Sequence, residues 1–217
     1  MANTTDVLIR EHRIIEKVLE CLEVLADRAG TDDFDVAVAH QVIRFVRRYA
    51  DVCHHSKEEG QLFPALEKKG FDADVGPTAT MREEHTELRA LTTAMAGALE
   101  GPSVGWRHAA FASNARRFAA YLADHIRKED HCLFPMAATI LTEDEHAALV
   151  ESFRAFEAET FAPGEIAELE ELPNELRIAL ELPSDSREFD RTNPHCCGAG
   201  DVAPSTPGTN GPGGPFP

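Results

Sequence analysis

The sequence predicts an all-α protein: an up-down antiparallel four-helix bundle followed by an additional C-terminal helix and a disordered tail. Three observations predict this fold. Apolar residues recur at helical spacing in four segments, short polar connections with glycine or proline separate these segments, and the second pair of segments repeats the motifs of the first pair. With 217 residues, of which 43% are hydrophobic, the chain is long enough for one domain with a substantial core.

The first two helices are expected from about Thr5 to Arg28, and from just after Asp33 to about His54. Gly30 follows the first helix where a C-terminal glycine is expected. The apolar residues that predict the first helix are Ile14, Ile15, Val18, Leu19, Leu22 and Leu25, and those that predict the second are Val36, Val42, Ile43 and Val46.

The third helix is expected from near Thr78 to about Leu99, and the fourth from about Trp106 past Glu129, with Gly101 and Pro102 between them. Prolines follow the second and fourth helices, at Pro64 and Pro135. Because proline cannot donate a backbone hydrogen bond and clashes with the preceding turn, both residues are expected to kink or end their helices.

A fifth helix is predicted after Pro135, since Thr142 to Glu145 fits a capping box. Acidic segments around 165–182 are expected to form short helices, interrupted by Pro173. Half of the 24 residues in 194–217 are proline or glycine, which predicts disorder. The chain is thus divided into a domain of residues 1–160, an acidic and partly helical extension of 161–193, and a tail of 194–217.

Two short stretches carry the repeat. HHSKEEGQLFP begins at His54, HIRKEDHCLFP begins at His125, and aligning their LFP triplets pairs His54 with His125 and Glu58 with Glu129. The first and third helices match as well, because REHRIIEKVL and EEHTELRALT each place one histidine early in the helix, His12 and His85. A helix pair written twice implies a site on a pseudo-twofold axis of the bundle.

Residues four apart on a helix share one face, so each H-x-x-x-E presents an imidazole and a carboxylate to one point. With the two single histidines, the set of candidate metal ligands is His12, His54, Glu58, His85, His125 and Glu129. Imidazole suits iron, zinc and copper, and a carboxylate can bridge two cations. Two metals with two histidines each use the whole set, whereas one zinc needs only four ligands.

Other readings of these residues compete with metal ligation. A single buried His–Glu pair could be a structural hydrogen bond, but the repeat favours ligation. Glu16 could be a seventh ligand, although its counterpart in the third helix is Arg89. His55 and Glu59 have no counterpart pair, so we expect them beside the ligands or at the surface. Tyr121, one turn before His125, is expected in a core wall that shields the metals, and it could also donate a hydrogen bond or ligate.

Several further residues are expected outside the site. Glu143-x-x-His146 occurs once and lies in a helix cap, so capping is favoured over ligation. The cysteines beside the ligand segments are expected to be buried or to lie behind the ligands, and HCCG at 195–198 is expected to belong to the disordered tail. The histidines expected to face solvent are His40, His108, His131 and His146.

The pattern His12, His54-x-x-x-Glu58, His85, His125-x-x-x-Glu129, with LFP after each pair, resembles the hemerythrin-like, or HHE cation-binding, domain. The resemblance implies a bundle holding two non-heme iron ions, bridged by carboxylates and by an oxo or hydroxo group. His12 and His54 would bind one iron, and His85 and His125 the other. Glu58 and Glu129 would be the bridging carboxylates.

One departure shifts the expected function. Oxygen-carrying hemerythrins have a second histidine where this chain has Arg89. The set of four histidines and two glutamates is similar to a branch of iron sensors, iron–sulfur repair proteins and stress-linked bacterial proteins. The resemblance therefore implies redox chemistry with dioxygen, peroxide or nitric oxide, including catalase- or peroxidase-like activity, together with a redox partner. The alternative is iron sensing, storage or donation.

Composition limits the partners. The chain has 21 basic and 38 acidic residues and a net charge of −17, which disfavours nucleic acid and anionic membranes. No apolar run is long enough to cross a bilayer, and the start lacks the pattern of a signal peptide. Five irregularly spaced cysteines favour a reducing cytoplasm.

Overall fold

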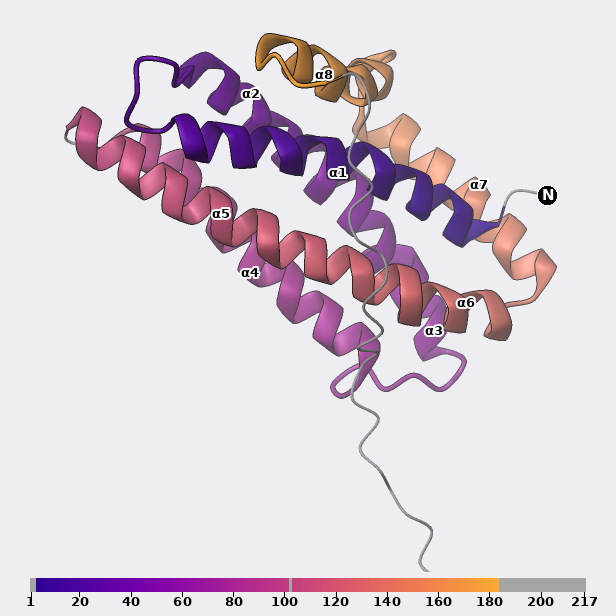
Figure 1. Ribbon diagram of the computed structural model, residues 1–217. Coiled ribbons are helices and arrows are strands. Elements are labelled where there is room, and N and C mark those ends of the chain that lie inside the picture. Colours follow the sequence, from indigo (N-terminus) through magenta and orange to yellow (C-terminus); the bar gives the residue numbers. More distant parts are fainter. Residues whose placement is uncertain (1–2, 102, 184–217) are drawn as a thin grey trace, which may run out of the picture.

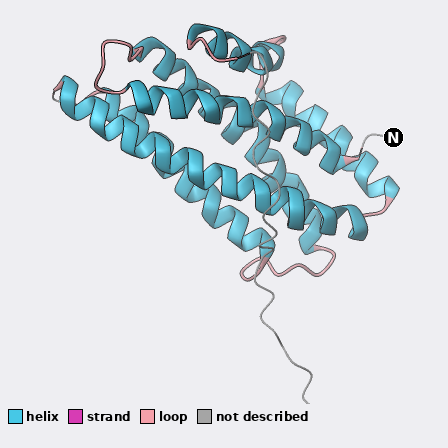
Figure 2. Ribbon diagram, in the orientation of Figure 1, coloured by secondary structure: helices cyan, strands magenta, loops and turns pink. Residues whose placement is uncertain are grey.

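The computed structural model describes residues 3–101 and 103–183, and these residues form helices and loops only (Figures 1 and 2). The chain order is α1 (Thr4–Arg28), α2 (Val36–Phe45), η1 (Val46–His55), η2 (Glu58–Leu62), α3 (Phe63–Glu67), α4 (Pro77–Leu99), α5 (Val104–Lys128), η3 (Glu129–Leu133), α6 (Phe134–Ile140), α7 (Glu143–Thr160) and α8 (Glu165–Ala179). The η segments are π-helical.

The bundle is up-down and antiparallel, which confirms the predicted fold class. Helix α1 runs away from the labelled N-terminus, the chain from α2 to α3 returns, α4 runs out again, and α5 returns beside α1 and α4 (Figure 1). At the end of α1, Gly30 takes a φ of +93°, a conformation in which glycine carries no steric cost. The first helix, predicted for residues 5–28, is confirmed by the bounds of α1.

The second and fourth helices pass through their prolines, so of the two predicted outcomes, a kink or an end, the structure excludes an end. The backbone N–H of Phe63 donates to the carbonyl of Glu58, and the N–H of Phe134 donates to that of Glu129, each five residues back. A proline inside an ordinary α-helix loses one hydrogen bond and collides with the carbonyl four residues back. A π turn widens the helix at that point, so both helices continue.

Two apolar clusters occupy the bundle. The larger one lies among α1, α2, η1, α4, α5 and α8. The smaller one contains both LFP triplets, with Leu62, Phe63, Leu133 and Phe134 all buried beside Leu8, Met81 and Phe153. Along each of the four bundle helices, the candidate ligands lie between the residues of these two clusters. Apolar packing therefore closes the site above and below.

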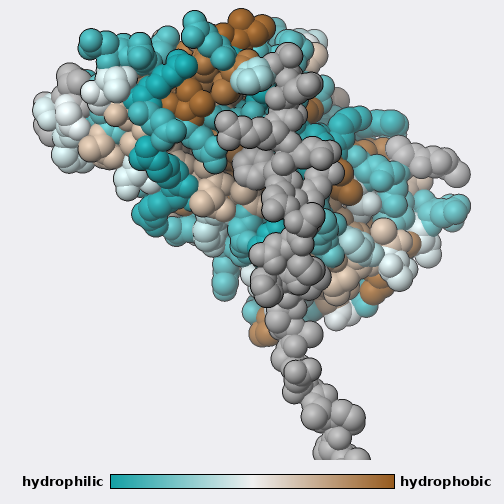
Figure 3. All heavy atoms as spheres, viewed as in Figure 1, coloured by the Kyte–Doolittle hydropathy of each residue, from teal (hydrophilic) through white to brown (hydrophobic). Residues whose placement is uncertain are grey.

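Two helices cover the bundle from outside. Helix α7 lies beside the start of α1, where the hydroxyl of Thr4 donates to the carbonyl of His146 at 3.2 Å. Its predicted capping box is confirmed, since Thr142 and Glu145 bond reciprocally. Helix α8 packs on α1 and α2, and Figure 3 shows hydrophobic residues gathered over it.

Helix α8 is one continuous helix of 15 residues with Pro173 inside it, so the prediction of short helices broken at that proline is wrong. A proline in a helix interior costs about 3 kcal/mol. Leu169, Leu172 and Leu176 share the buried face of the helix, and burying each leucine contributes about 1.5–3 kcal/mol. Packing therefore outweighs the local cost of the proline.

In the described residues no helix has both the length and the apolar character needed to cross a membrane. The predicted tail of 194–217, including HCCG, lies outside the described residues, as do residues 184–193 of the predicted acidic extension.

Candidate metal centre

The six candidate ligands predicted from the repeat meet in the middle of the bundle, and each is at most 1% exposed. Glu129 Oε2 lies 3.2 Å from Nε2 of both His12 and His125. Glu58 lies 3.6 Å from Nε2 of His54 and 3.5 Å from Nε2 of His85. Each glutamate therefore touches one histidine from each half of the repeat, which is the arrangement that a bridging carboxylate requires.

The same atoms form two groups of potential metal ligands, in each of which one atom per residue lies within 4.8 Å of the others. One group is His12, His54, Glu58 and Glu129, and the other is His55, Glu58, His85 and His125. Nε2 of His85 and Nε2 of His125 approach to 3.1 Å. Glu58 belongs to both groups, so two cations bound there would be neighbours.

Every one of the four predicted histidines points its second ring nitrogen at a carboxylate. Nδ1 of His12 lies 2.8 Å from Asp130, Nδ1 of His54 lies 2.9 Å from Glu11, Nδ1 of His85 lies 2.7 Å from Glu59, and Nδ1 of His125 lies 2.9 Å from Glu84. Because an ionised carboxylate only accepts hydrogen bonds, each Nδ1 carries the proton. Nε2 is then left to bind a metal, as in most histidine metal sites.

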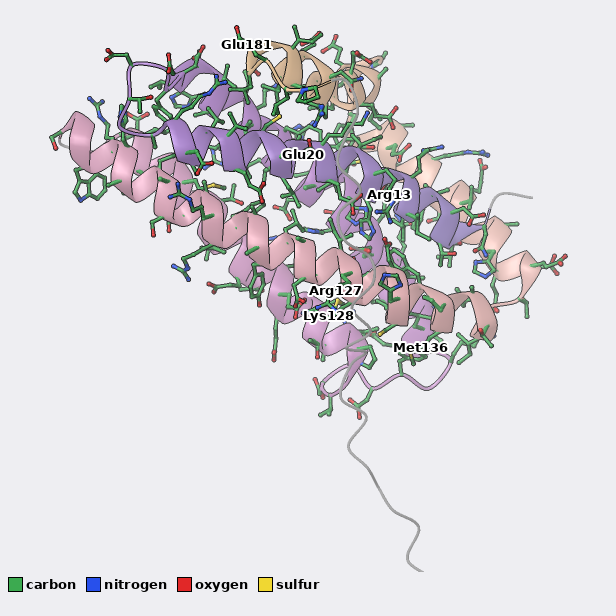
Figure 4. All side chains as sticks on the ribbon, viewed as in Figure 1. Arg13, Glu20, Arg127, Lys128, Met136 and Glu181 are labelled. Atoms are coloured by element: carbon green, nitrogen blue, oxygen red, sulfur yellow. The ribbon has the colours of Figure 1, made fainter. Side chains whose placement is uncertain are left out.

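Cations hold these carboxylates in turn. Lys57 pairs with Glu11, and Lys128 pairs with Glu84. The two carboxylates that hold the single histidines are each paired with an arginine from the same helix as that histidine. Arg13 pairs with Asp130, and Arg89 donates to Glu59 at 2.8 Å. Figure 4 labels Arg13 on α1 and Lys128 at the end of α5.

These supporting residues were not predicted, although the repeat contains them. A glutamate precedes each single histidine, as Glu11 and Glu84. Each H-x-x-x-E is in full H-x-x-K-E followed by an acid, Glu59 in the first copy and Asp130 in the second. A wider alignment of the two copies would have identified the lysines and the acids together.

The donor set fits metal cations. Nε2 of His12 and of His54 and both oxygens of Glu58 and of Glu129 are buried without a hydrogen-bond partner. Leaving buried polar groups unpaired is costly, and charged carboxylates cost most. Bound cations would satisfy all of these atoms together, because imidazole nitrogen and carboxylate oxygen are ordinary ligands of divalent first-row metals.

The pKa values of the buried glutamates and histidines are shifted in opposite directions by burial and by their charged neighbours. Burial, and then the neighbouring Glu129, raise the pKa of Glu58 well above its ordinary value. Burial also favours protonation of Glu129, but His125 and His12 outweigh it and lower the pKa of that carboxyl. Burial lowers the pKa of His54. For His125 the carboxylates Glu129 and Glu84 overcome burial and raise the pKa to about 9.

His55 lies inside the site, not at the surface. Its side chain is 3% exposed and stacks on the ring of His85, with 3.8 Å between centroids and 15° between planes. Asp51 lies 3.7 Å from Nδ1, too far for a hydrogen bond, and neither ring nitrogen has a partner. Burial lowers the pKa of His55 to about 4, so the ring is neutral near pH 7.

Tyr121 does not form the expected wall, since 36% of it is exposed, whereas Phe118, one turn earlier on the same helix, is buried. Glu16 accepts a hydrogen bond from Arg13 at 2.7 Å and stays outside both ligand groups. Cys53 is buried, as expected, and Cys132 is half-buried.

Two of the histidines expected to face solvent do so, His40 and His131. His108 is half-buried and accepts a hydrogen bond from the backbone N–H of Gly30 at 3.0 Å. His146 is buried, because α7 packs on the start of α1 and brings the ring within 3.1 Å of the Thr4 hydroxyl. The expectation for these last two residues is therefore wrong.

Comparison with known proteins gives a family and relatives in mycobacteria. Residues 3–137 match the family described as the hemerythrin HHE cation-binding domain. The uncharacterized proteins Rv1995 of Mycobacterium tuberculosis and Mb2018 of Mycobacterium bovis are each 27% identical over 158 residues, which cover 71% of this chain. The chain spans 61% of the length of each of these curated relatives.

Proposed function

Because the chain belongs to the family of hemerythrin HHE cation-binding domains, we propose that it is a non-heme di-iron protein that binds or reacts with dioxygen, peroxide or nitric oxide in the response to oxidative or nitrosative stress. One observation carries the proposal. Four buried histidines turn Nδ1 to carboxylates and Nε2 inward, toward two buried glutamates whose oxygens have no hydrogen-bond partner.

The proposed ligands follow the two halves of the repeat. His12 and His54 would hold one iron, His85 and His125 would hold the other, and Glu58 and Glu129 would contribute to both. The distances support this assignment, since each glutamate lies within 3.6 Å of one histidine from each pair. Bound iron supplies a change between the ferrous and ferric states and open coordination positions for a small ligand.

The protein's own residues supply orientation and exclusion of water. The four carboxylates behind the histidines fix the ring orientations, an arrangement that raises the basicity of a ligand. The LFP triplets and the larger apolar cluster exclude water from both ends of the site. A reactive small ligand is thereby kept apart from bulk solvent and from competing reactions.

The first experiment measures the metal content and the ultraviolet–visible spectrum of aerobically purified protein. We expect two irons per chain, with charge-transfer bands that change on adding peroxide or nitric oxide. His54→Ala and Glu58→Ala should lose iron, whereas His40→Ala, a change at an exposed histidine, should keep it. Zinc alone, no metal, or a spectrum that responds to none of these ligands would rule the proposal out.

The alternative function is iron sensing, storage or donation, including repair of iron–sulfur clusters. The net charge of −17 favours it, because an acidic surface attracts cations. Exchange with a chelator separates the two functions. Iron that leaves within minutes and restores an apo iron–sulfur protein would support donation, whereas iron that stays bound through repeated exposure to peroxide would support the redox function.

A further inference from the structure

We propose that neutral diatomic gases, dioxygen or nitric oxide, reach the metal pair through a cavity between η1 and α4, and that His55 is the gate at its inner end. The inference rests on the proposed function and narrows it. It selects gases among the small ligands and assigns them one side of the site, that of His85 and His125.

The cavity has a volume of about 210 Å³. Its lining changes from exposed Arg47 and Thr93 to buried Phe118 and His55, so it leads from the surface to the wall of the metal centre. A cavity of this size admits molecules of a few atoms. It lies on the side of the bundle where η1 faces α4.

The interior of the cavity suits an apolar guest. Its deeper walls are Val46, Ala50, Leu88 and Phe118. Two polar side chains of the lining are already paired, because the hydroxyl of Thr92 donates to the carbonyl of Leu88 at 2.8 Å and Arg89 donates to Asp51 at 2.7 Å. The unpaired ring nitrogens of His55 lie at the inner end. Apolar walls favour apolar guests such as xenon. Neutral diatomic gases fit this chemistry better than an anion does.

His55 separates the cavity from the proposed ligands. His55 is one of the lining residues of the cavity, and its ring stacks on that of His85 with 3.8 Å between the ring centroids. A metal bound by a histidine lies near the plane of the ring, so two parallel stacked rings cannot share one metal in this arrangement. His55 therefore blocks the path in the observed rotamer. Since no hydrogen bond holds either ring nitrogen, rotation of the ring breaks none.

The other side of the site is enclosed by different groups. There Lys57, fully buried, fills the space between Glu11 and Glu157, and α7 lies over it. In the second half, the residue at the position matching His55 is Ile126, which lies in the larger apolar cluster. The imidazole of His55 is thus a departure from the repeat, and it lies where the proposed path of the gas meets the metal centre.

Two variants and one matched control test the gate. Ala50→Leu fills the cavity and His55→Ala opens its inner end. Ala119→Leu makes the same change as Ala50→Leu at another buried alanine, which lines a cavity of about 270 Å³ away from the metal centre. We expect nitric oxide to bind the reduced, iron-loaded protein about tenfold more slowly in Ala50→Leu and about tenfold faster in His55→Ala, as for a gated step. Ala119→Leu should bind at the wild-type rate.

A second readout does not depend on iron. Crystals of the wild-type protein under xenon pressure should show xenon in this cavity, and crystals of Ala50→Leu should not. Absence of xenon from the wild-type cavity, or rates that change in neither variant while both retain two irons per chain, would overturn the inference and leave the proposed function standing. If the wild type binds no iron but xenon occupies the cavity, the proposed function fails by itself. If Ala50→Leu does not fold, the binding rate of His55→Ala and xenon binding by the wild type still test the proposed path.

Discussion

The two halves of the centre hold their histidines in the same way but are enclosed differently. In the first half, the carboxylate that holds His54 is paired with Lys57, which is 0% exposed and also pairs with Glu157 of α7 at 2.7 Å. In the second half, the carboxylate that holds His125 is paired with Lys128, whose side chain is 20% exposed and pairs with Asp124 at 3.2 Å. Helix α7 follows the residues that match the family, 3–137, so the closure of the first half comes from outside the matched segment.

This difference teaches that a symmetric set of ligands can serve an asymmetric site. The repeat fixes the chemistry around each pair of histidines, whereas the surroundings decide which pair a small ligand can approach. We infer that the closed half holds its metal with little exchange and that the half beside His55 meets the ligand. The following predictions test this division.

The largest expected effect separates the two lysines. Lys57→Met leaves the buried carboxylate of Glu11 and its neighbour Glu157 without their cation, and breaking a buried pair in this way costs about 3–5 kcal/mol. Lys128→Met removes a pair whose lysine is 20% exposed, so solvent can replace part of the lost interaction and we expect a smaller loss of about 1–2 kcal/mol. Urea unfolding of both variants measures the difference in the free energy of unfolding. Equal losses would show that α7 does not make the first half distinct.

The next effect should be the same in both halves. Asp130→Asn and Glu59→Gln each weaken the group that orients a single histidine, His12 or His85. Changes to such supporting groups typically lower metal affinity by about 10–100-fold. Competition with a chelator measures the loss for each variant. A loss confined to one variant would mean that the symmetry of the ligand set does not extend to the carboxylates behind it.

The smallest effect concerns the helix that closes the first half. Thr142→Ala removes the N-cap of α7 and should cost about 1 kcal/mol of stability. Because the cap lies at the far end of α7 from Glu157, we expect iron content to stay at the wild-type level. Thermal unfolding together with metal analysis checks both statements. Loss of iron in this variant would show that α7 holds the metal directly and not only the lysine beside it.

Sequence reasoning predicted the bundle and the residues that meet in it, because a ligand pair four residues apart on a helix also appears as a spacing in the sequence. It left other positions open. Because His55 has no counterpart pair, it was expected beside the ligands or at the surface, and the structure places it beside them, in the π-helical η1. Glu59 and Asp130 each hold a histidine of the other repeat copy, a contact across the bundle that spacing within one helix does not contain.

The exposed Tyr121 shows a second limit. Its distance from His125 predicts a shared helix face, but which part of that face is covered depends on how α5 sits against its neighbours. The course of α8 has a similar cause, since Pro173 gives a strong local signal for interruption while the burial of three leucines is a tertiary effect. Local patterns therefore predicted which segments are helical, but not which helix faces are buried by neighbouring elements.

Because of the π turns before Pro64 and Pro135, the direction in which later side chains point depends on the exact number of residues in these helices. Each π turn closes over five residues where an α turn closes over four, so it acts as a one-residue insertion in an otherwise regular helix. If η2 took the α form with no residue removed, everything after it would rotate by about 100° relative to His54. Phe63 would then leave the apolar cluster, although no ligand and no apolar residue had been changed. The phase of the helix is thus part of what the H-x-x-x-E…LFP motif encodes.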